Sequence, residues 1–254
     1  MKCFQYLGKT GLLVWMICFW ASANAQRDIN KDVFLKDMSL LKESFFKGGN
    51  VSFDMTYYYS NEHTPKRYTD SVKGKIEIEG KKSRIVMDNT ETISTGKYTI
   101  ILVKEDKLMY LAKSIDSLKE QLNPLAAMDS IFSKIAGLAY HVTTTGKQKN
   151  YILEFPPGYP CKKMEIVVDE KMHRVVKTTS TVKTADVLQD PGSYNNGDKF
   201  EAYTNIETRF TNYRFGAVDT TPMNEGYYFA KEGNDFKVSS LYKGYTIYKG
   251  MKGL

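Results

Sequence analysis

The sequence predicts a mainly β protein of the α+β class, in which a curved antiparallel sheet forms an unclosed half-barrel with an N-terminal helix and a mid-chain lid helix. An apolar stripe with helical spacing ends at Gly48-Gly49, and a long series of segments with a period of two follows it. One further helical pattern, over residues 123–137, interrupts that series. Wide twisted sheets curl, so the two helices are available to cover the apolar face.

The first 25 residues have the composition of a secretion signal. Two lysines precede an apolar run over residues 11–20, which is short for a membrane span, and an A-x-A cleavage motif ends at Ala25. We expect export and cleavage after Ala25, with a retained membrane anchor as the alternative. A lipid-anchored protein is not expected, because Cys18 lies inside the apolar run and not at the cleavage point.

Cleavage would leave residues 26–254 as a single domain of 229 residues. Its one cysteine, Cys161, excludes an intramolecular disulfide, so the fold depends on burial of roughly 70% of the unfolded surface. The formal charge falls from +7 to +5, because the leader contains two lysines and no acid. The remaining lysines are dispersed, which favours a solvated basic surface and gives no sign of a nucleic-acid site. We expect a monomer.

The first helix is expected over residues 28–47, because its apolar residues recur on one stripe. That stripe consists of Phe34, Met38, Leu41 and Phe45. Alternating strands should follow, with turns at Gly80 and at Glu105-Asp106. These strands are expected over residues 51–59, 72–79, 83–87, 98–103 and 107–112.

The second helix should begin at Asn123 as the cap, with Pro124 at its first position, and end near Gly137. Strands then resume, and an unpatterned stretch over residues 185–198 indicates a long loop. The later strands are expected over residues 139–145, 151–155, 163–169, 174–183 and 200–213, with shorter ones within residues 227–248.

About ten strands at roughly 4.8 Å spacing make a sheet much wider than a helix of about 10 Å can cover. Some apolar surface is therefore expected to be free for a ligand. The alternative is that the same residues fill a solid core. The predicted lining of an apolar cavity comprises Phe53, Met55, Tyr57, Ile76, Ile78, Tyr98 and Ile100 from the sheet and Met128, Phe132 and Ile135 from the second helix.

Three segments carry a family resemblance. Gly74 to Ile78 followed by Ser83 to Met87, the stretch from Met164 to Val182, and the stretch from Ile206 to Tyr213 are similar to the LolA/LolB superfamily of envelope lipoprotein carriers. The likeness spans most of residues 28–215 and is a pattern of hydrophobicity and turns. The loop at 185–198 and the tail beyond Ser240 exceed the family core, and the family's lid-locking arginine has no assigned position here.

The resemblance implies a periplasmic, LolA-like lipid-binding domain whose concave face receives acyl chains under helical lids. It implies a soluble carrier or chaperone of the outer-membrane lipoprotein-sorting type, which accepts lipoproteins or other lipids from one envelope protein and delivers them to another. The alternative is a lipid-responsive sensor or envelope assembly factor that uses the fold for protein interaction. No cofactor is implied.

An enzyme is not expected. The mature histidines are His63, His141 and His173, and none is paired at metal-ligand spacing. Cys161 and His173 should lie on the order of 26 Å apart along the hairpin at 3.3 Å per residue, which is too far for proton transfer. We therefore predict no catalytic residue and no metal ligand, and a hydrolase stays only as an alternative.

The acidic residues likewise give no catalytic pair. Glu77 and Glu79 share one strand face at about 6.6 Å, which is a spacing that glycosidases use. They alternate with Ile76 and Ile78, so the sequence predicts that they lie on a solvated convex face. The aspartates of the 185–198 loop lack the order of a calcium-binding loop.

Overall fold

The computed structural model describes most of the chain after the expected leader. The described residues are 27–46, 49–114, 132, 134–187, 200–233 and 235–250. The predicted signal peptide, most of the predicted mid-chain helix with Asn123 and Met128, the side chain of Phe45 and most of the 185–198 loop lie outside these residues. Among the described residues, none of the helices is long and apolar enough to cross a membrane.

The described residues form 15 strands and a few short helices besides one long helix. The helices are α2 (Lys31–Phe46), α5 (Thr184–Val187) and α6 (Glu225–Tyr228), with 3-10 turns η2 (Thr221–Met223) and η3 (Ser240–Tyr242). The strands are β1 (Arg27–Asp28), β2 (Asn50–Asn61), β3 (Tyr68–Glu79), β4 (Lys82–Met87), β5 (Thr90–Ser94), β6 (Tyr98–Val103), β7 (Leu108–Lys113), β8 (Ala139–Thr145), β9 (Gln148–Glu154), β10 (Cys161–Asp169), β11 (Arg174–Lys183), β12 (Tyr203–Phe215), β13 (Phe229–Glu232), β14 (Asp235–Val238) and β15 (Thr246–Lys249).

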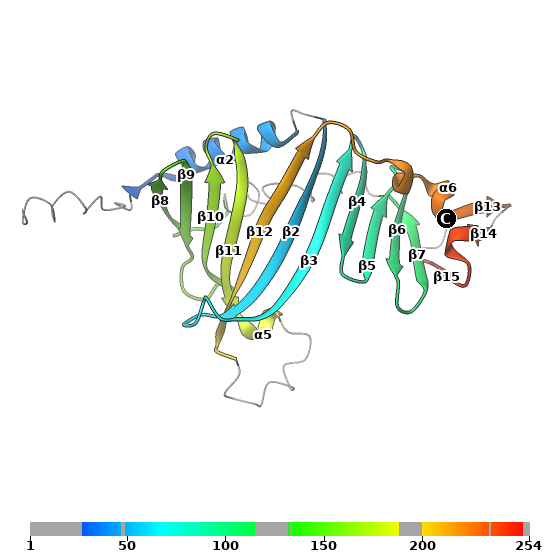
Figure 1. The fold of residues 1–254 in the computed structure, drawn as a ribbon. Helices are drawn as coiled ribbons and strands as arrows, with labels where there is room; N and C mark the ends of the chain where they lie inside the picture. Colours follow the sequence, from blue (N-terminus) through cyan, green and yellow to red (C-terminus); the bar gives the residue numbers. More distant parts are fainter. Residues whose placement is uncertain are drawn as a thin grey trace, which may run out of the picture.

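Thirteen of these strands form one curved, unclosed sheet, and β13 and β14 form a separate hairpin (Figure 1). The order across the sheet is β1-β8-β9-β10-β11-β12-β2-β3-β4-β5-β6-β7-β15. Every neighbouring pair is antiparallel except β7 and β15, which are parallel. The predicted fold class is therefore confirmed.

Local sequence explains most of these elements. The carbonyl side chain of Asn30 accepts a hydrogen bond of 2.9 Å from the backbone N–H of Val33, which caps the start of α2. Strands β6, β8 and β11 have the predicted bounds. Strand β5 was not predicted, and α5 forms one helical turn at the start of the predicted loop.

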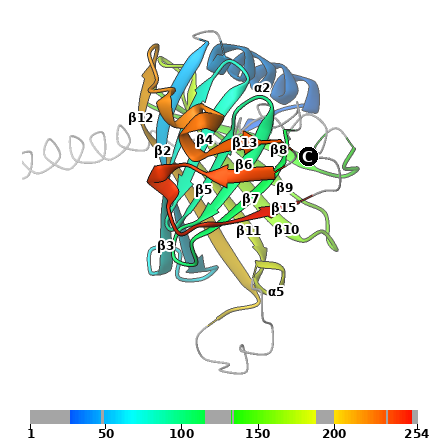
Figure 2. The same ribbon diagram turned by 90° about the vertical axis from the view of Figure 1, so that its right-hand side faces the viewer.

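The first hydrophobic core lies between α2 and the face of the sheet that we call the inner face, on the side toward which the sheet bends (Figures 1 and 2). Phe34 and Met38 of α2 are 0% and 1% exposed, and they pack in one cluster with Phe53 and Ile78 of the inner face. The ring of Phe34 lies 6.0 Å from that of Phe132. This part of the inner face is filled by side chains.

A second core lies on the opposite face, which we call the outer face, over β5, β6 and β7. The C-terminal segment of residues 223–247 packs against it and supplies Tyr228, Phe229 and Phe236 (Figure 2). The buried strand residues are Ile93, Ile100, Leu102, Met109 and Leu111. The sheet therefore buries its inner face at one end and its outer face at the other.

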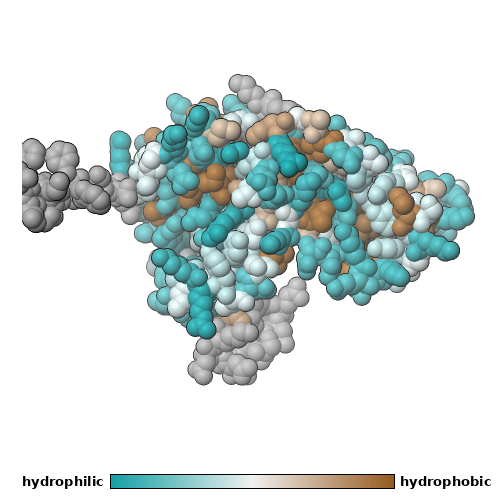
Figure 3. Space-filling view, viewed as in Figure 1, coloured by the Kyte–Doolittle hydropathy of each residue, from teal (hydrophilic) through white to brown (hydrophobic). Residues whose placement is uncertain are grey.

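A network of charges lies on the outer face beside this second core. Arg84 is bonded to Glu91 at 2.6 Å and to Glu77 at 3.2 Å, and Lys104 lies 3.2 Å from Glu91. The expectation that Glu77 is solvated is wrong, since its exposure is only 6%. The C-terminal segment covers this network, and the Tyr228 hydroxyl lies 3.3 Å from Glu91. Figure 3 shows that other parts of this side are mainly hydrophilic.

Replacement of Phe34 by alanine tests the first core. Phe34→Ala should lower the free energy of unfolding by about 3–5 kcal/mol, because it leaves a cavity between α2 and the sheet. Val33→Ala is the matched control, since Val33 is 44% exposed on the same helix and should change stability by less than about 0.5 kcal/mol. Urea denaturation measures both, and equal effects would show that α2 does not support the core.

Replacement of Glu91 by glutamine tests the charge network. Burial alone would raise the pKa of Glu91, but Arg84 and Lys104 lower it below its ordinary 4.5. A lowered folded-state pKa gives stability that is present above pH 4.5 and is lost as the pH falls through the folded value. Glu91→Gln should cost about 1.5–3 kcal/mol at pH 7 and reduce the loss of stability in acid. Glu232→Gln, in an exposed pair with Lys237, should change neither.

Candidate functional site

The candidate site is the part of the inner face that α2 does not fill. Cross-strand register places Phe53, Ile76, Ile85, Thr92, Ile101, Tyr110 and Tyr248 in one continuous row across β2 to β7 and β15. Exposure along this row rises from 1% at Phe53 and 6% at Ile76 to 37% at Ile101 and 41% at Tyr110. The row therefore runs from the closed core onto an open apolar surface.

A parallel row lies beside it, nearer the hairpin tips. It contains Met55, Gly74, Met87, Thr90, Val103 and Leu108. A Cβ at Gly74 would meet the Met55 and Met87 side chains and the carbonyl of Val86 at 3.0–3.1 Å. Glycine at this position therefore leaves room for the two methionine side chains to pack against β3. Met87, Val103 and Leu108 are partly exposed. We call the residues Ile85, Met87, Ile101, Val103, Leu108, Tyr110 and Tyr248 the open strip.

The predicted cavity residues are divided by the structure. Phe53, Met55, Ile76, Ile78 and Phe132 are buried in the first core, and Tyr57 and Ile135 are partly buried against it. The sequence pattern did not identify the open strip. Its aliphatic residues belong to the predicted strands, but their exposure depends on which side chains the rest of the chain covers.

Tyr98 and Ile100 require a correction. They lie on the outer face in the second core, because the register places Ile101 and not Ile100 opposite Thr92 and in line with Ile85. Residues 100–103 are all apolar, so alternation could not show which face of this strand was which. These two residues therefore do not share a surface with Phe53.

Two small cavities lie elsewhere among the described residues. One of about 180 Å³ lies between α2 and the β9–β11 strands, where Asp37 bonds to Lys149 at 2.7 Å and to the Tyr151 hydroxyl at 2.6 Å. Burial raises the pKa of Asp37, but these two bonds outweigh it and lower the pKa overall. The Asp37 carboxylate is therefore held by bonds within the fold, to Lys149 and Tyr151.

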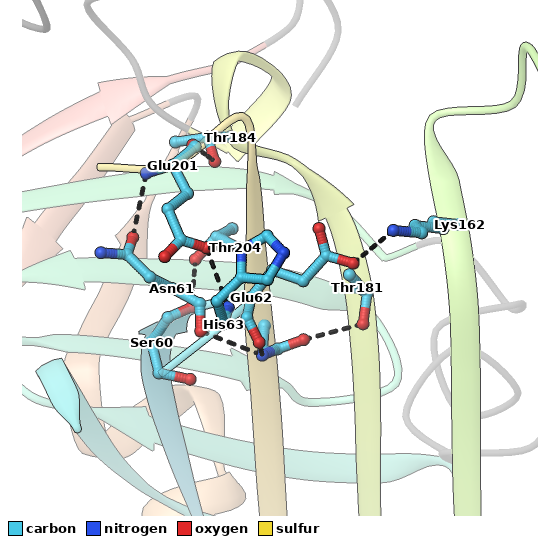
Figure 4. A network of polar contacts seen from close by, with 10 residues as sticks. Ser60, Asn61, Glu62, His63, Lys162, Thr181, Thr184, Glu201 and Thr204 are labelled. Carbon is cyan, nitrogen blue, oxygen red and sulfur yellow. Dashed lines mark hydrogen bonds and ion pairs between the residues drawn. The ribbon is translucent and has the colours of Figure 1, made fainter. Parts of the chain in front are cut away.

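The other cavity, of about 440 Å³, is lined by residues 183–185 and 200–203. A polar network lies next to it, where β2 and β11 end and β12 begins (Figure 4). His63 is hydrogen-bonded to Glu201 at 2.8 Å, and Thr181 donates to the side chain of Asn205 at 2.7 Å. The first bond ties the loop after β2 to the segment that leads into β12, and the second ties β11 to β12.

The residues with catalytic potential are not brought together. Cys161 lies opposite Val182 at the open end of the β10–β11 hairpin, and His173 lies in the turn at the other end, so the predicted separation is confirmed. Burial raises the pKa of the Cys161 thiol to about 11. His141 contacts Asp28 at 2.6 Å. Among the described residues, no group of three or more possible ligands could hold a metal ion.

Comparison with known proteins gives similarity of structure alone. No family model matches the sequence, and no curated protein matches it. An uncharacterized conserved protein from Thermus thermophilus aligns with a TM-score of 0.43 and 5% identity, over 75% of this chain and 92% of that one. A LolA superfamily protein from Nitrosomonas europaea aligns with a TM-score of 0.33 and 11% identity, over 76% of this chain and 98% of that one. A proposed outer membrane lipoprotein-sorting protein domain from Vibrio parahaemolyticus aligns with a TM-score of 0.28 and 14% identity, over 73% of this chain and 95% of that one.

All three structures align with TM-scores below 0.5 and identities below 25%, so these similarities carry no argument about the family of this chain or about what it binds. The functional argument rests on the open strip and its surroundings.

Proposed function

We propose that this protein is an exported periplasmic carrier that binds the acyl chains of lipids or lipoproteins on the inner face of its sheet. The open strip supports this proposal, because it continues the buried core as an apolar surface with 37–49% exposure at Ile101, Tyr110 and Tyr248. Exposed apolar surface next to a core marks a binding site more often than a random surface does. The role is binding without catalysis.

The geometry of the strip suits an elongated apolar ligand. It extends across β4 to β15, which is four strand spacings or about 19 Å. The rings of Tyr110 and Tyr248 stack with centroids 5.5 Å apart at the sheet edge. An extended hydrocarbon chain could lie across these strands and remove their side chains from water at about 25 cal/mol per Å².

A charged substitution in the strip tests this function. Ile101→Glu should reduce co-purifying lipid at least tenfold, because it places a carboxylate where the chain would lie, while the fold stays intact since Ile101 is partly exposed already. Native mass spectrometry and lipid extraction of protein purified from its own envelope measure the bound lipid. Phe132 is unsuitable for this test, because it is 4% exposed and contacts Phe34.

Leu241→Glu provides the matched control. Leu241 is 66% exposed on η3, in the segment that covers the outer face, and its substitution should leave bound lipid unchanged. Circular dichroism and denaturation midpoints confirm that both variants are folded. Wild-type protein without any acyl species, or equal lipid loss in both variants, would contradict the proposal.

Export is tested at the cleavage site. The mature protein should begin at Gln26, because the signal ends in a small residue at Ala25. Ala25→Leu should retain the leader, whereas Asn24→Leu should still be cleaved, since the middle position of the motif tolerates large residues. Intact mass of the protein in the periplasmic fraction reads the start of the chain, and an uncleaved wild type would indicate the membrane-anchored alternative.

A further inference from the structure

Side-chain hydroxyls gather on one part of the inner face, separated from the open strip by β3. Register places Tyr57 of β2 opposite Thr208 of β12, and Thr208 opposite Thr178 of β11. In the next row, Tyr59 lies opposite Ile206, and Ile206 lies opposite Ser180. Five hydroxyls therefore occupy three adjacent strands on the same face.

Four of these hydroxyls are available to a ligand, and the fifth, on Thr208, is buried, since that residue is 6% exposed. Each can both donate and accept a hydrogen bond, and none of the five makes a side-chain hydrogen bond within the described part of the chain. Thr204, on the same face of β12, provides the contrast, because its hydroxyl donates to the carbonyl of Ser60 at 2.9 Å. Tyr57, Tyr59, Thr178 and Ser180 are partly exposed.

The hydroxyls have few charges near them. Among the described residues of β2, β3, β11 and β12, Asp70 lies opposite Tyr59 toward the exposed end of β3, and the guanidinium of Arg174, at the other end of β11 from Ser180, lies 5.0 Å from the ring of Tyr213. On β9, Lys149 is already paired with Asp37 at 2.7 Å. A buried carboxylate or phosphate beside Thr178 would be repelled by Asp70 and would lie about 13 Å along β11 from Arg174, which is too far for a direct ion pair.

We infer that this inner face takes a neutral amphiphile of the acylglycerol class, whose ester and hydroxyl oxygens bond to the hydroxyls of β2 and β11 while its acyl chain lies on the open strip. This inference rests on the proposed function and names its ligand class. One ligand could reach both regions, since β2, which carries two of the hydroxyls, and β7, which carries part of the open strip, are five strand spacings, or about 24 Å, apart across the sheet.

A competition assay with three ligands of one chain length tests the inference. The wild-type mature protein should bind 1-oleoylglycerol at least tenfold more tightly than oleate or oleoyl-lysophosphatidylglycerol at pH 8, measured by displacement of a fluorescent apolar probe. The acyl chain is the same in all three, so the ratio reports only on the head of the ligand. Comparable affinity for a charged ligand would overturn the inference.

A matched pair of double variants locates the preference. Tyr57→Phe with Thr178→Val should weaken 1-oleoylglycerol binding about tenfold and leave oleate binding unchanged, because only hydrogen bonds to the neutral head are removed. Tyr58→Phe with Thr179→Val makes the same chemical changes one residue along each strand, on the outer face, and should change neither affinity.

The outcomes separate the two proposals. Equal behaviour of the two double variants would overturn the hydroxyl assignment while leaving lipid binding in place. If none of the three ligands displaced the probe from folded wild-type protein, the proposed function would fail, and the ligand class would fail with it.

Discussion

The structure depends on a change of buried face across one continuous sheet. At β2 and β3 the inner face is buried under α2, whereas at β6 and β7 the outer face is buried under the C-terminal segment. Successive side chains of a strand point to opposite faces, and among the described residues the inner-face side chains of Ile101 on β6 and Tyr110 on β7 are 37% and 41% exposed. The open strip lies on the inner face of the part of the sheet that buries its outer face in the second core.

The transition between the two halves needs the charge network on the outer face. Glu77 lies behind the first core and Glu91 lies beside the second, and Arg84 on the intervening strand bonds to both. Buried carboxylates without a partner would destabilise the fold, so the arginine allows both faces to be covered within three strands. Tyr228 connects the same network to the C-terminal segment, since its hydroxyl lies 3.3 Å from Glu91 and 2.5 Å from the carbonyl oxygen of Pro222. The tail is thus held by polar contacts as well as by its aromatic side chains.

Local patterns predicted the elements better than they predicted their environment. The stripe of Phe34, Met38 and Leu41 gave α2, and alternation gave the bounds of β8 and β11, because these signals are contained in neighbouring residues. The short β5 (TETIS) has little apolar alternation, and the parallel pairing of β15 with β7 joins segments more than 130 residues apart. The cavity prediction failed at Ile100 because residues 100–103 are all apolar, so only the pairing with β5 shows that Ile100 faces the second core.

The composition of the open strip indicates that folding alone does not account for it. Thr90, Thr92 and Thr99 occupy the same inner face of β5 and β6, so this surface accommodates polar β-branched residues without loss of strand pairing. Ile101, Val103, Leu108 and Tyr110 nevertheless stand on the neighbouring positions, although the second core gains nothing from them because they point away from it. Exposed aliphatic side chains on strands also increase the risk of aggregation. The proposed binding of an acyl chain accounts for these residues, because a bound chain would cover them.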